Sequence, residues 1–238
     1  MAPETRTAAV LWDFDGTLAD TAGDFASAGN AMRARRSLPA LPVDAYREVA
    51  RHGGRGAVRT AMRLTADSPV DPELLEEFFA AYESTLCVQT RFYPNIRTIL
   101  AGLAEAGIAW GIVINKAARF AIPLAQKLGL SPDVLIAGDS TAYRKPHPAP
   151  ISAAVEALGL PASACVFVGD DDSDVMAAEA AGVGSIRVTY GYGMPTATVT
   201  QGRKVDSTAE LFHALICRPL RGSPQRKTDC WCSSSALV

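Results

Sequence analysis

The stretch Leu11-Trp12-Asp13-Phe14-Asp15-Gly16-Thr17-Leu18 places two carboxylates at the end of an apolar run that begins at Ala8. Such a short continuous apolar run is typical of a buried strand. Residues i and i+2 of an extended chain point to the same side, so Asp13 and Asp15 share one side of the strand end, and Gly16 allows a tight turn after them. One acid could act as a nucleophile while the other transfers a proton, if a cation offsets their charge. Taken alone, the stretch fits an ordinary strand and Asp-Gly turn equally well.

The composition is that of an ordinary globular protein. The chain has 238 residues, of which 48% are hydrophobic and 20% charged, and its formal net charge is −2. This length suits one large or two small domains, and the mild acidity is not the charge signature of nucleic-acid binding. No apolar run is long enough to span a membrane, and the apolar core of a signal peptide is missing. Five scattered cysteines indicate reduced thiols, so we expect a cytoplasmic protein that binds neither nucleic acid nor membranes.

The segment 19–89 has the pattern of helices. Apolar and charged residues recur at helical spacing in four stretches, which Pro- or Gly-containing segments separate. The predicted helices are 24–36, 43–51, 56–64 and 72–86. No strand pattern interrupts them, so the sequence predicts an all-helical insert after the first strand.

From Pro94 onwards, apolar strands alternate with helices. The predicted strands are 108–114, 134–137, 165–168 and 185–188. The predicted helices are 94–107, 116–128, 149–158, 174–181 and 208–216. This alternation predicts a parallel sheet covered on both faces. We therefore expect an α/β core from 1–18 and 90–218, the helical insert 19–89, and a mobile tail 219–238 without periodicity.

Four polar segments fall at strand ends of this predicted sheet. They are Asp13-x-Asp15, Asn115-Lys116, Lys145-Pro146 and Gly169-Asp170-Asp171-Asp172-Ser173-Asp174. The carboxyl ends of parallel strands lie along one edge of a sheet. We therefore expect the acids, the amide and the lysine to converge on one crevice.

The acidic run after Val168 predicts a metal site. Four acids within five positions, close to the acids of the first strand, would be costly to hold without a cation. Oxygen ligands that leave room for water and phosphate suit Mg²⁺ better than zinc. The alternative is that Asp172 or Ser173 only caps the following helix, for which one such residue is enough.

Two further groups could bind a phosphate. Lys145, in a loop before a helix, could neutralise a phosphoryl oxygen, although a lone loop lysine is usually solvated. Asn115 and the first backbone N–H groups of the helix after it form a second anion cradle.

In this order the motifs resemble the haloacid dehalogenase (HAD) superfamily of phosphatases, over residues 8–215. The resemblance rests on the DxDGT motif, the asparagine after the second strand, the KP lysine and the GDxxxD run. The helical insert is similar to the cap of subclass I members. Further segments resemble the phosphoglycolate phosphatase group, and most of all its N-acetylmuramic acid 6-phosphate phosphatase branch. These segments are Asp20-Thr21-Ala22-Gly23-Asp24-Phe25, Trp110-Gly111-Ile112-Val113, Arg119-Phe120 and Tyr190-Gly191-Tyr192-Gly193.

The resemblance implies a Rossmann-like parallel sheet with an inserted helical cap, acting on a small-molecule phosphate ester as a monomer or homodimer. It implies that Asp13 is the nucleophile that forms an aspartyl-phosphate. Asp15 would protonate the leaving alcohol and then activate water. Lys145 and Asn115 would hold the phosphoryl oxygens.

The resemblance also implies Mg²⁺ as cofactor. The ion would be bound by Asp13, the backbone carbonyl of Asp15 and Asp170. Asp174 would support it through water or through the neighbouring lysine. Gly16 and Thr17 would lie at the substrate.

One position departs from the family pattern. The family places Thr or Ser before the asparagine of its second motif, and here that position is Ile114. A lost hydrogen bond to a charged group costs about 1.5–3 kcal/mol. Two functions therefore stay open, a phosphatase of small metabolites and a phosphate-ester-binding protein with weak or no turnover.

The cap segment Arg51-His52-Gly53-Gly54-Arg55-Gly56 bears on the choice of substrate. Phosphoglycolate and N-acetylmuramic acid 6-phosphate both carry a carboxylate besides the phosphate. The fixed charge of Arg55, beside a flexible glycine backbone, could face that carboxylate. Ordinary solvated arginines at a helix end fit the segment equally well, so the preferred ester stays open.

Overall fold

The sheet at the centre of the molecule has six strands and is parallel throughout. The computed structural model describes residues 7–193, 199 and 202–217. The strands of this sheet are β1 (Ala9–Trp12), β4 (Ala109–Val113), β5 (Val134–Ile136), β6 (Cys165–Gly169), β7 (Gly184–Val188) and β8 (Arg203–Val205). They lie in the order β5-β4-β1-β6-β7-β8, and each neighbouring pair is parallel. The α/β parallel sheet predicted from the sequence is confirmed.

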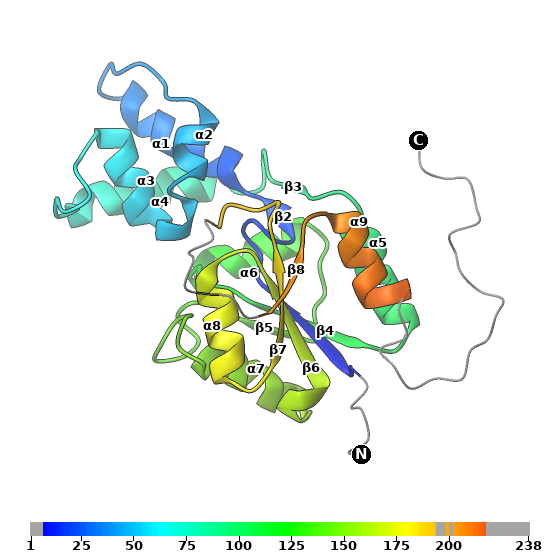
Figure 1. Cartoon of the computed structure of the whole chain (residues 1–238). Coiled ribbons are helices and arrows are strands. Elements are labelled where there is room, and N and C mark those ends of the chain that lie inside the picture. The colour runs from blue at the N-terminus through cyan, green and yellow to red at the C-terminus, as the bar shows by residue number, and fades with distance from the viewer. Residues whose placement is uncertain (1–6, 194–198, 200–201, 218–238) are drawn as a thin grey trace, which may run out of the picture.

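Side chains of β1 alternate between two hydrophobic clusters on opposite faces of the sheet. Val10 and Trp12 belong to one cluster, whereas Ala9 and Leu11 belong to the other. The first cluster includes residues of α5 (Ile96–Glu105), α6 (Ala118–Lys127) and α9 (Thr208–Phe212). The second includes residues of α7 (Ala149–Leu158) and α8 (Asp172–Ala180). Because both faces are covered (Figure 1), the polar residues of the sheet gather at its carboxyl edge.

A helical segment lies between the short strands β2 (Ala19–Asp20) and β3 (Arg91–Phe92). Its helices are α1 (Ala22–Ala34), α2 (Val43–Arg47), α3 (Gly53–Met62) and α4 (Pro72–Thr85). In Figure 1 these four helices lie to one side of the sheet. Strand β2 pairs antiparallel with β3, so the two passages of the chain between sheet and helices run side by side.

Aromatic rings join the helical segment to the sheet side of the molecule. Phe120 of α6 packs against Phe79 and Tyr82 of α4, with ring centroids 5.2 and 5.3 Å apart. Phe25 of α1 packs edge-on against Tyr82 at 4.8 Å. These rings place α1 and α4 close to the carboxyl edge of the sheet.

Two predictions from the sequence concern the rest of the chain. The predicted mobile tail 219–238 lies outside the described residues. Among the helices that the structure describes, none combines the length and the hydropathy needed to cross a bilayer.

Candidate active site

Asp13 directly follows the interior strand β1. This strand pairs with β4 on one side and with β6 on the other. The backbone N–H of Asp13 donates to the carbonyl oxygen of Val168 at 2.8 Å, which extends the ladder one residue beyond β1. Asp13 therefore lies at the same edge as Ile114 and Asn115 after β4, and as Asp170 after β6. The parallel topology brings together the segments that the sequence predicts to converge.

The carboxylate of Asp170 is fixed by donors from two other loops. Thr17 Oγ1 donates to its Oδ1 at 2.9 Å, and the backbone N–H groups of Tyr192 and Gly193 donate to its Oδ2 at 2.7 and 2.9 Å. Gly16 has a φ of +87°, and a Cβ there would lie only 2.3 Å from Asp170 Oδ2, so the site requires glycine. Burial, and then the charge of Asp174, raise the pKa of Asp170 to about 7 despite these donors.

The ammonium of Lys145 lies among three acceptors. Its Nζ is 2.8 Å from Asp13 Oδ1 and 2.8 Å from Asp174 Oδ1, and it donates to the carbonyl oxygen of Val113 at 2.7 Å. Burial alone would lower the pKa of Lys145, but the two carboxylates outweigh it and raise the pKa above the usual range. Lys145 therefore carries a fixed positive charge into the site.

Asp174 also takes part in the cap of α8. Its Oδ2 accepts from the backbone N–H of Asp171 at 3.0 Å, while Asp171 Oδ1 accepts from the N–H of Ser173 at 2.9 Å. The two acids form a reciprocal capping box. The capping residue is therefore Asp171, rather than Asp172 or Ser173 as the alternative from the sequence proposes, and the cap coexists with the acidic cluster.

Asn115 holds the backbone of Lys145 through both of its polar atoms. Its Nδ2 donates to the Lys145 carbonyl oxygen at 3.0 Å, and its Oδ1 accepts from the Lys145 N–H at 3.0 Å. This reciprocal pair fixes the loop that carries the lysine. In the structure Asn115 positions Lys145, and its contact with a phosphoryl oxygen stays a prediction.

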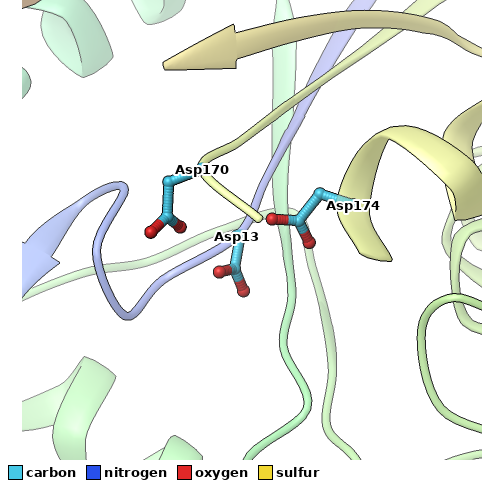
Figure 2. A group of neighbouring side chains, drawn as sticks. All are labelled: Asp13, Asp170 and Asp174. Carbon is cyan, nitrogen blue, oxygen red and sulfur yellow. The ribbon is translucent and has the colours of Figure 1, made fainter. Parts of the chain in front are cut away.

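Three carboxylates face a common space, as Figure 2 shows. Oxygen atoms of Asp13, Asp170 and Asp174 all lie within 4.8 Å of one another, and all three residues are buried. Opposite ligands of an octahedral Mg²⁺ are about 4.2 Å apart, so small side-chain shifts would bring these oxygens around one ion. Within this cluster three carboxylates meet the single ammonium of Lys145, which leaves two negative charges for a divalent cation to neutralise. The donor set therefore fits Mg²⁺.

The burial and the neighbouring carboxylates also affect the pKa of Asp13. Burial raises the pKa of Asp13 well above its usual value, and the charges of Asp174 and Asp170 raise it further against the opposing effect of Lys145. A cation in the cluster would favour the ionised form, which is the nucleophilic form of a carboxyl group.

The carboxylate of Asp15 pairs with a different lysine, Lys116. Its Oδ1 accepts from Lys116 Nζ at 2.7 Å and from Thr21 Oγ1 at 2.5 Å. Lys116 Nζ also donates to the hydroxyl oxygen of Tyr82 at 2.8 Å. Burial alone would lower the pKa of Lys116, but Asp15 and Tyr82 raise it above the usual range. Desolvation in turn raises the pKa of Tyr82 to about 12, so its hydroxyl stays neutral.

A pocket of about 320 Å³ lies between the sheet edge and the helical segment. Asp13, Asp15, Asn115, Lys145 and Asp170 line it from the sheet side, together with Lys116 and Asp174. From the helical segment it is lined by Phe25, Ala50, Arg51, His52, Gly53, Gly54, Phe78, Phe79 and Tyr82. The pocket thus combines a charged floor with a wall that includes the aromatic rings of Phe25, Phe78, Phe79 and Tyr82.

Three residues that the sequence places at the substrate do not line this pocket. Gly16 and Thr17 contact Asp170 instead, and Thr17 is fully buried. Arg55 is exposed and lies outside the pocket lining, whereas Arg51 belongs to it. Of the two arginines in the segment 51–56, only Arg51 belongs to the pocket lining, and the contact of Arg55 with the substrate stays a prediction.

Sequence reasoning gives no role to Lys116, Tyr82 or Thr21, which surround Asp15. The position of Lys116 in the sequence does indicate a site residue, because it follows Asn115 at a strand end of the predicted sheet. Tyr82 lies on a predicted helix 67 positions after Asp15 in the sequence, and no local pattern connects the two.

Comparisons with known proteins agree on one family. The family described as haloacid dehalogenase-like hydrolase matches residues 7–182. The N-acetylmuramic acid 6-phosphate phosphatase of Pseudomonas aeruginosa is 40% identical over 192 residues, which are 80% of this chain and 85% of that protein. A phosphoglycolate phosphatase of Xanthomonas campestris pv. campestris is 39% identical over 186 residues, which are 77% of this chain and 84% of that protein.

A solved structure shows the same architecture. The crystal structure of a predicted phosphoglycolate phosphatase from Haemophilus somnus has a TM-score of 0.76 and 25% sequence identity, and the match covers 87% of this chain and 97% of that chain. The family match covers well over half of the chain and includes all four motifs. The chain therefore belongs to the haloacid dehalogenase-like hydrolases, as the order of its motifs predicts.

Proposed function

We propose that this phosphatase is Mg²⁺-dependent and hydrolyses a small carboxylated phosphomonoester through an aspartyl-phosphate on Asp13. The observation that carries the proposal is the position of Asp13. Its carboxylate lies at the pocket, 2.8 Å from the Lys145 ammonium, and faces Asp170 and Asp174. A nucleophile thus shares one site with the charges needed to hold a phosphoryl group.

The chemistry would run in two steps. In the first, an oxygen of Asp13 attacks phosphorus, the ester P–O bond breaks, and Asp15 gives its proton to the leaving oxygen. In the second, Asp15 takes a proton from water, the water oxygen attacks the aspartyl-phosphate, and phosphate and the free carboxylate of Asp13 are released. Lys145 offsets negative charge in both steps.

The metal site supports these steps electrostatically. Asp13, Asp170 and the backbone carbonyl of Asp15 would hold Mg²⁺, with Asp174 supporting it and holding Lys145. When bound, the ion supplies positive charge to the phosphoryl oxygens. We also propose that the helical segment 19–89 acts as the cap that covers the site.

The pocket favours an ester larger than phosphoglycolate. Its volume of about 320 Å³ falls in the range of about 300–1,000 Å³ that is typical of sites for drug-sized ligands. A two-carbon acid would leave most of that space, and the aromatic wall, without contact. An N-acetylated sugar acid such as N-acetylmuramic acid 6-phosphate would fill it, which agrees with the Pseudomonas relative.

Purified protein should release phosphate from N-acetylmuramic acid 6-phosphate in the presence of Mg²⁺. We expect kcat/KM to exceed that for phosphoglycolate by about tenfold or more, since contacts to the larger group stabilise the transition state. Removal of the cation with EDTA should reduce the rate to background, and added Mg²⁺ should restore it. A higher kcat/KM for phosphoglycolate would contradict the argument from pocket size.

Ile114 supports a second candidate function, a phosphate-ester-binding protein with little turnover. The residue is buried and lines the pocket beside Asn115, where a hydroxyl donor to phosphate would otherwise stand. Binding of N-acetylmuramic acid 6-phosphate or phosphoglycolate seen by calorimetry, without phosphate release from either ester, would select this alternative. The presence of Asp13, Asp15 and Lys145 at one pocket favours the enzyme.

Replacement of Arg51 by Ala should raise KM for N-acetylmuramic acid 6-phosphate by about tenfold, the effect of a lost hydrogen bond to a charged group. Arg51 lines the pocket and its Nη1 lies 3.8 Å from Asp171 Oδ2, so it spans from the helical segment to the sheet edge. N-acetylglucosamine 6-phosphate lacks the carboxylate and should be affected little.

The matched control for this prediction is Arg55→Ala, four residues further along the same segment. Because Arg55 is exposed and outside the pocket lining, we expect KM to stay within about twofold for both esters. A larger KM effect for Arg55→Ala than for Arg51→Ala would return the carboxylate contact to Arg55.

A further inference from the structure

The proposed acid and base, Asp15, is held by donors that depend on the helical segment. Both Lys116 and Thr21 donate to the same oxygen, Oδ1, at 2.7 and 2.5 Å. Thr21 stands immediately before α1. Two donors on one oxygen fix the rotation of the carboxylate and leave the other oxygen, Oδ2, to carry the proton.

Lys116 is in turn held from the helical segment. Its Nζ donates to the hydroxyl of Tyr82 on α4 at 2.8 Å. The same nitrogen lies 5.3 Å from the ring centre of Tyr82 and 5.4 Å from that of Phe25 on α1. The flexible lysine side chain therefore has a defined position because α1 and α4 lie over it.

We infer that Lys116 is a positioning residue, which orients Asp15 for proton transfer and links that orientation to the docking of α4 through Tyr82. The inference rests on the proposed role of Asp15. Lys116 follows the strand β4 in the sheet, whereas Tyr82 belongs to the helical segment, so one ammonium contacts both parts. Asp15 and Lys116 therefore take the positions needed for proton transfer to the leaving oxygen when α1 and α4 cover the pocket.

The dependence on the leaving group separates this role from a general loss of structure. The oxygen of a sugar ester is a poor leaving group and needs a proton as the P–O bond breaks. The oxygen of p-nitrophenyl phosphate leaves as a stable anion and needs little help. A variant with a displaced Asp15 should therefore lose kcat/KM for the sugar ester and keep most of it for the aryl ester.

The experiment measures kcat/KM of the full chain with Mg²⁺ on two substrates. One is p-nitrophenyl phosphate, and the other is the alkyl ester with the higher kcat/KM of N-acetylmuramic acid 6-phosphate and phosphoglycolate. Lys116→Met should lower kcat/KM for the alkyl ester by about tenfold to a hundredfold, part of the 10²–10⁴ that a general acid supplies, and by less than about threefold for the aryl ester. Tyr82→Phe, which removes only the hydroxyl, should show the same preference at about three- to tenfold. The double variant should fall no further than Lys116→Met alone, because both changes break one linkage.

Tyr46→Phe is the matched control. Tyr46 is a buried tyrosine of the same helical segment, and its hydroxyl donates to Asn30 Oδ1 at 3.2 Å, within that segment. It should change neither rate. If Lys116→Met fails to fold, as judged by circular dichroism, Tyr82→Phe decides the question in its place.

Equal losses on both esters in Lys116→Met or Tyr82→Phe would overturn the inference. So would a rise in KM confined to carboxylated esters, because Lys116 would then bind the substrate itself. Failure of the proposed function would look different, since the unmodified protein would then hydrolyse neither ester.

Discussion

The Asp13→Asn variant is expected to lose phosphatase activity by at least about a thousandfold, because a neutral carboxamide is too weak a nucleophile to form the phosphoryl intermediate. Asn has the shape of Asp, and Lys145 keeps its bonds to Asp174 and to the carbonyl oxygen of Val113. The fold should therefore survive the change. Phosphate release from the alkyl ester with the highest kcat/KM and from p-nitrophenyl phosphate measures the loss, and thermal unfolding checks the fold.

Asp171→Asn is the matched control for this prediction. Asp171 also lines the pocket and also lies beside the acidic cluster, but its carboxylate caps α8, a task that Asn performs equally well. We expect its kcat to stay within about threefold of the unmodified protein. Full activity in Asp13→Asn would exclude Asp13 as the nucleophile, and an equal loss in both variants would assign the effect to the charge of the pocket.

The sequence was sufficient to predict five of the six strands of the sheet, because each of these five contains an apolar run. Strands β1, β4 and β6 read as continuous apolar runs, and the structure pairs them as neighbours. Strand β8 (Arg203–Val205) was missed for the opposite reason. It lies at the edge of the sheet, and Arg203 and Lys204 are exposed, so it has no apolar run to detect.

Local propensity was misleading at the start of α3. The sequence favours a break at Gly53-Gly54, since glycine is a poor helix former. In the structure α3 begins at Gly53, whose φ of +59° suits glycine, and a Cβ on Gly54 would lie 2.6 Å from the ring of Phe79. Contact with α4, which the sequence does not reveal, therefore decides the residue type at Gly54.

In the site, too, some features follow from the sequence pattern and others depend on three-dimensional packing. The convergence of Asp13, Lys145 and Asp170 follows from parallel topology, and sequence reasoning could place them at one edge. The partner of Asn115 and the link from Lys116 to Tyr82 depend on how loops and helices pack in three dimensions. The roles of the site residues and the domain boundaries stay predictions until they are tested.

Lys145→Met is expected to reduce activity by at least about a thousandfold, because it removes the ammonium that offsets the charge of nucleophile and phosphate. It should also destabilise the fold. The Lys145 side chain is 2% exposed and lies 2.8 Å from both Asp13 and Asp174, so its loss leaves three buried carboxylates without their cation. Removal of one partner from a buried ion pair costs about 3–5 kcal/mol, which for a chain of this size lowers Tm by roughly 6–20 °C.

The effect of added Mg²⁺ on Tm distinguishes an electrostatic cause of the destabilisation from a loss of packing. In Lys145→Met the cluster would carry three negative charges instead of two, so added Mg²⁺ should raise Tm by more in the variant than in the unmodified protein. Lys204→Met is the control, because that lysine is 65% exposed and pairs with Asp206 at the surface, where a change of Tm above about 2 °C is not expected. A Lys145→Met variant whose Tm and activity match those of the unmodified protein would show that Lys145 neither balances the acidic cluster nor serves the reaction.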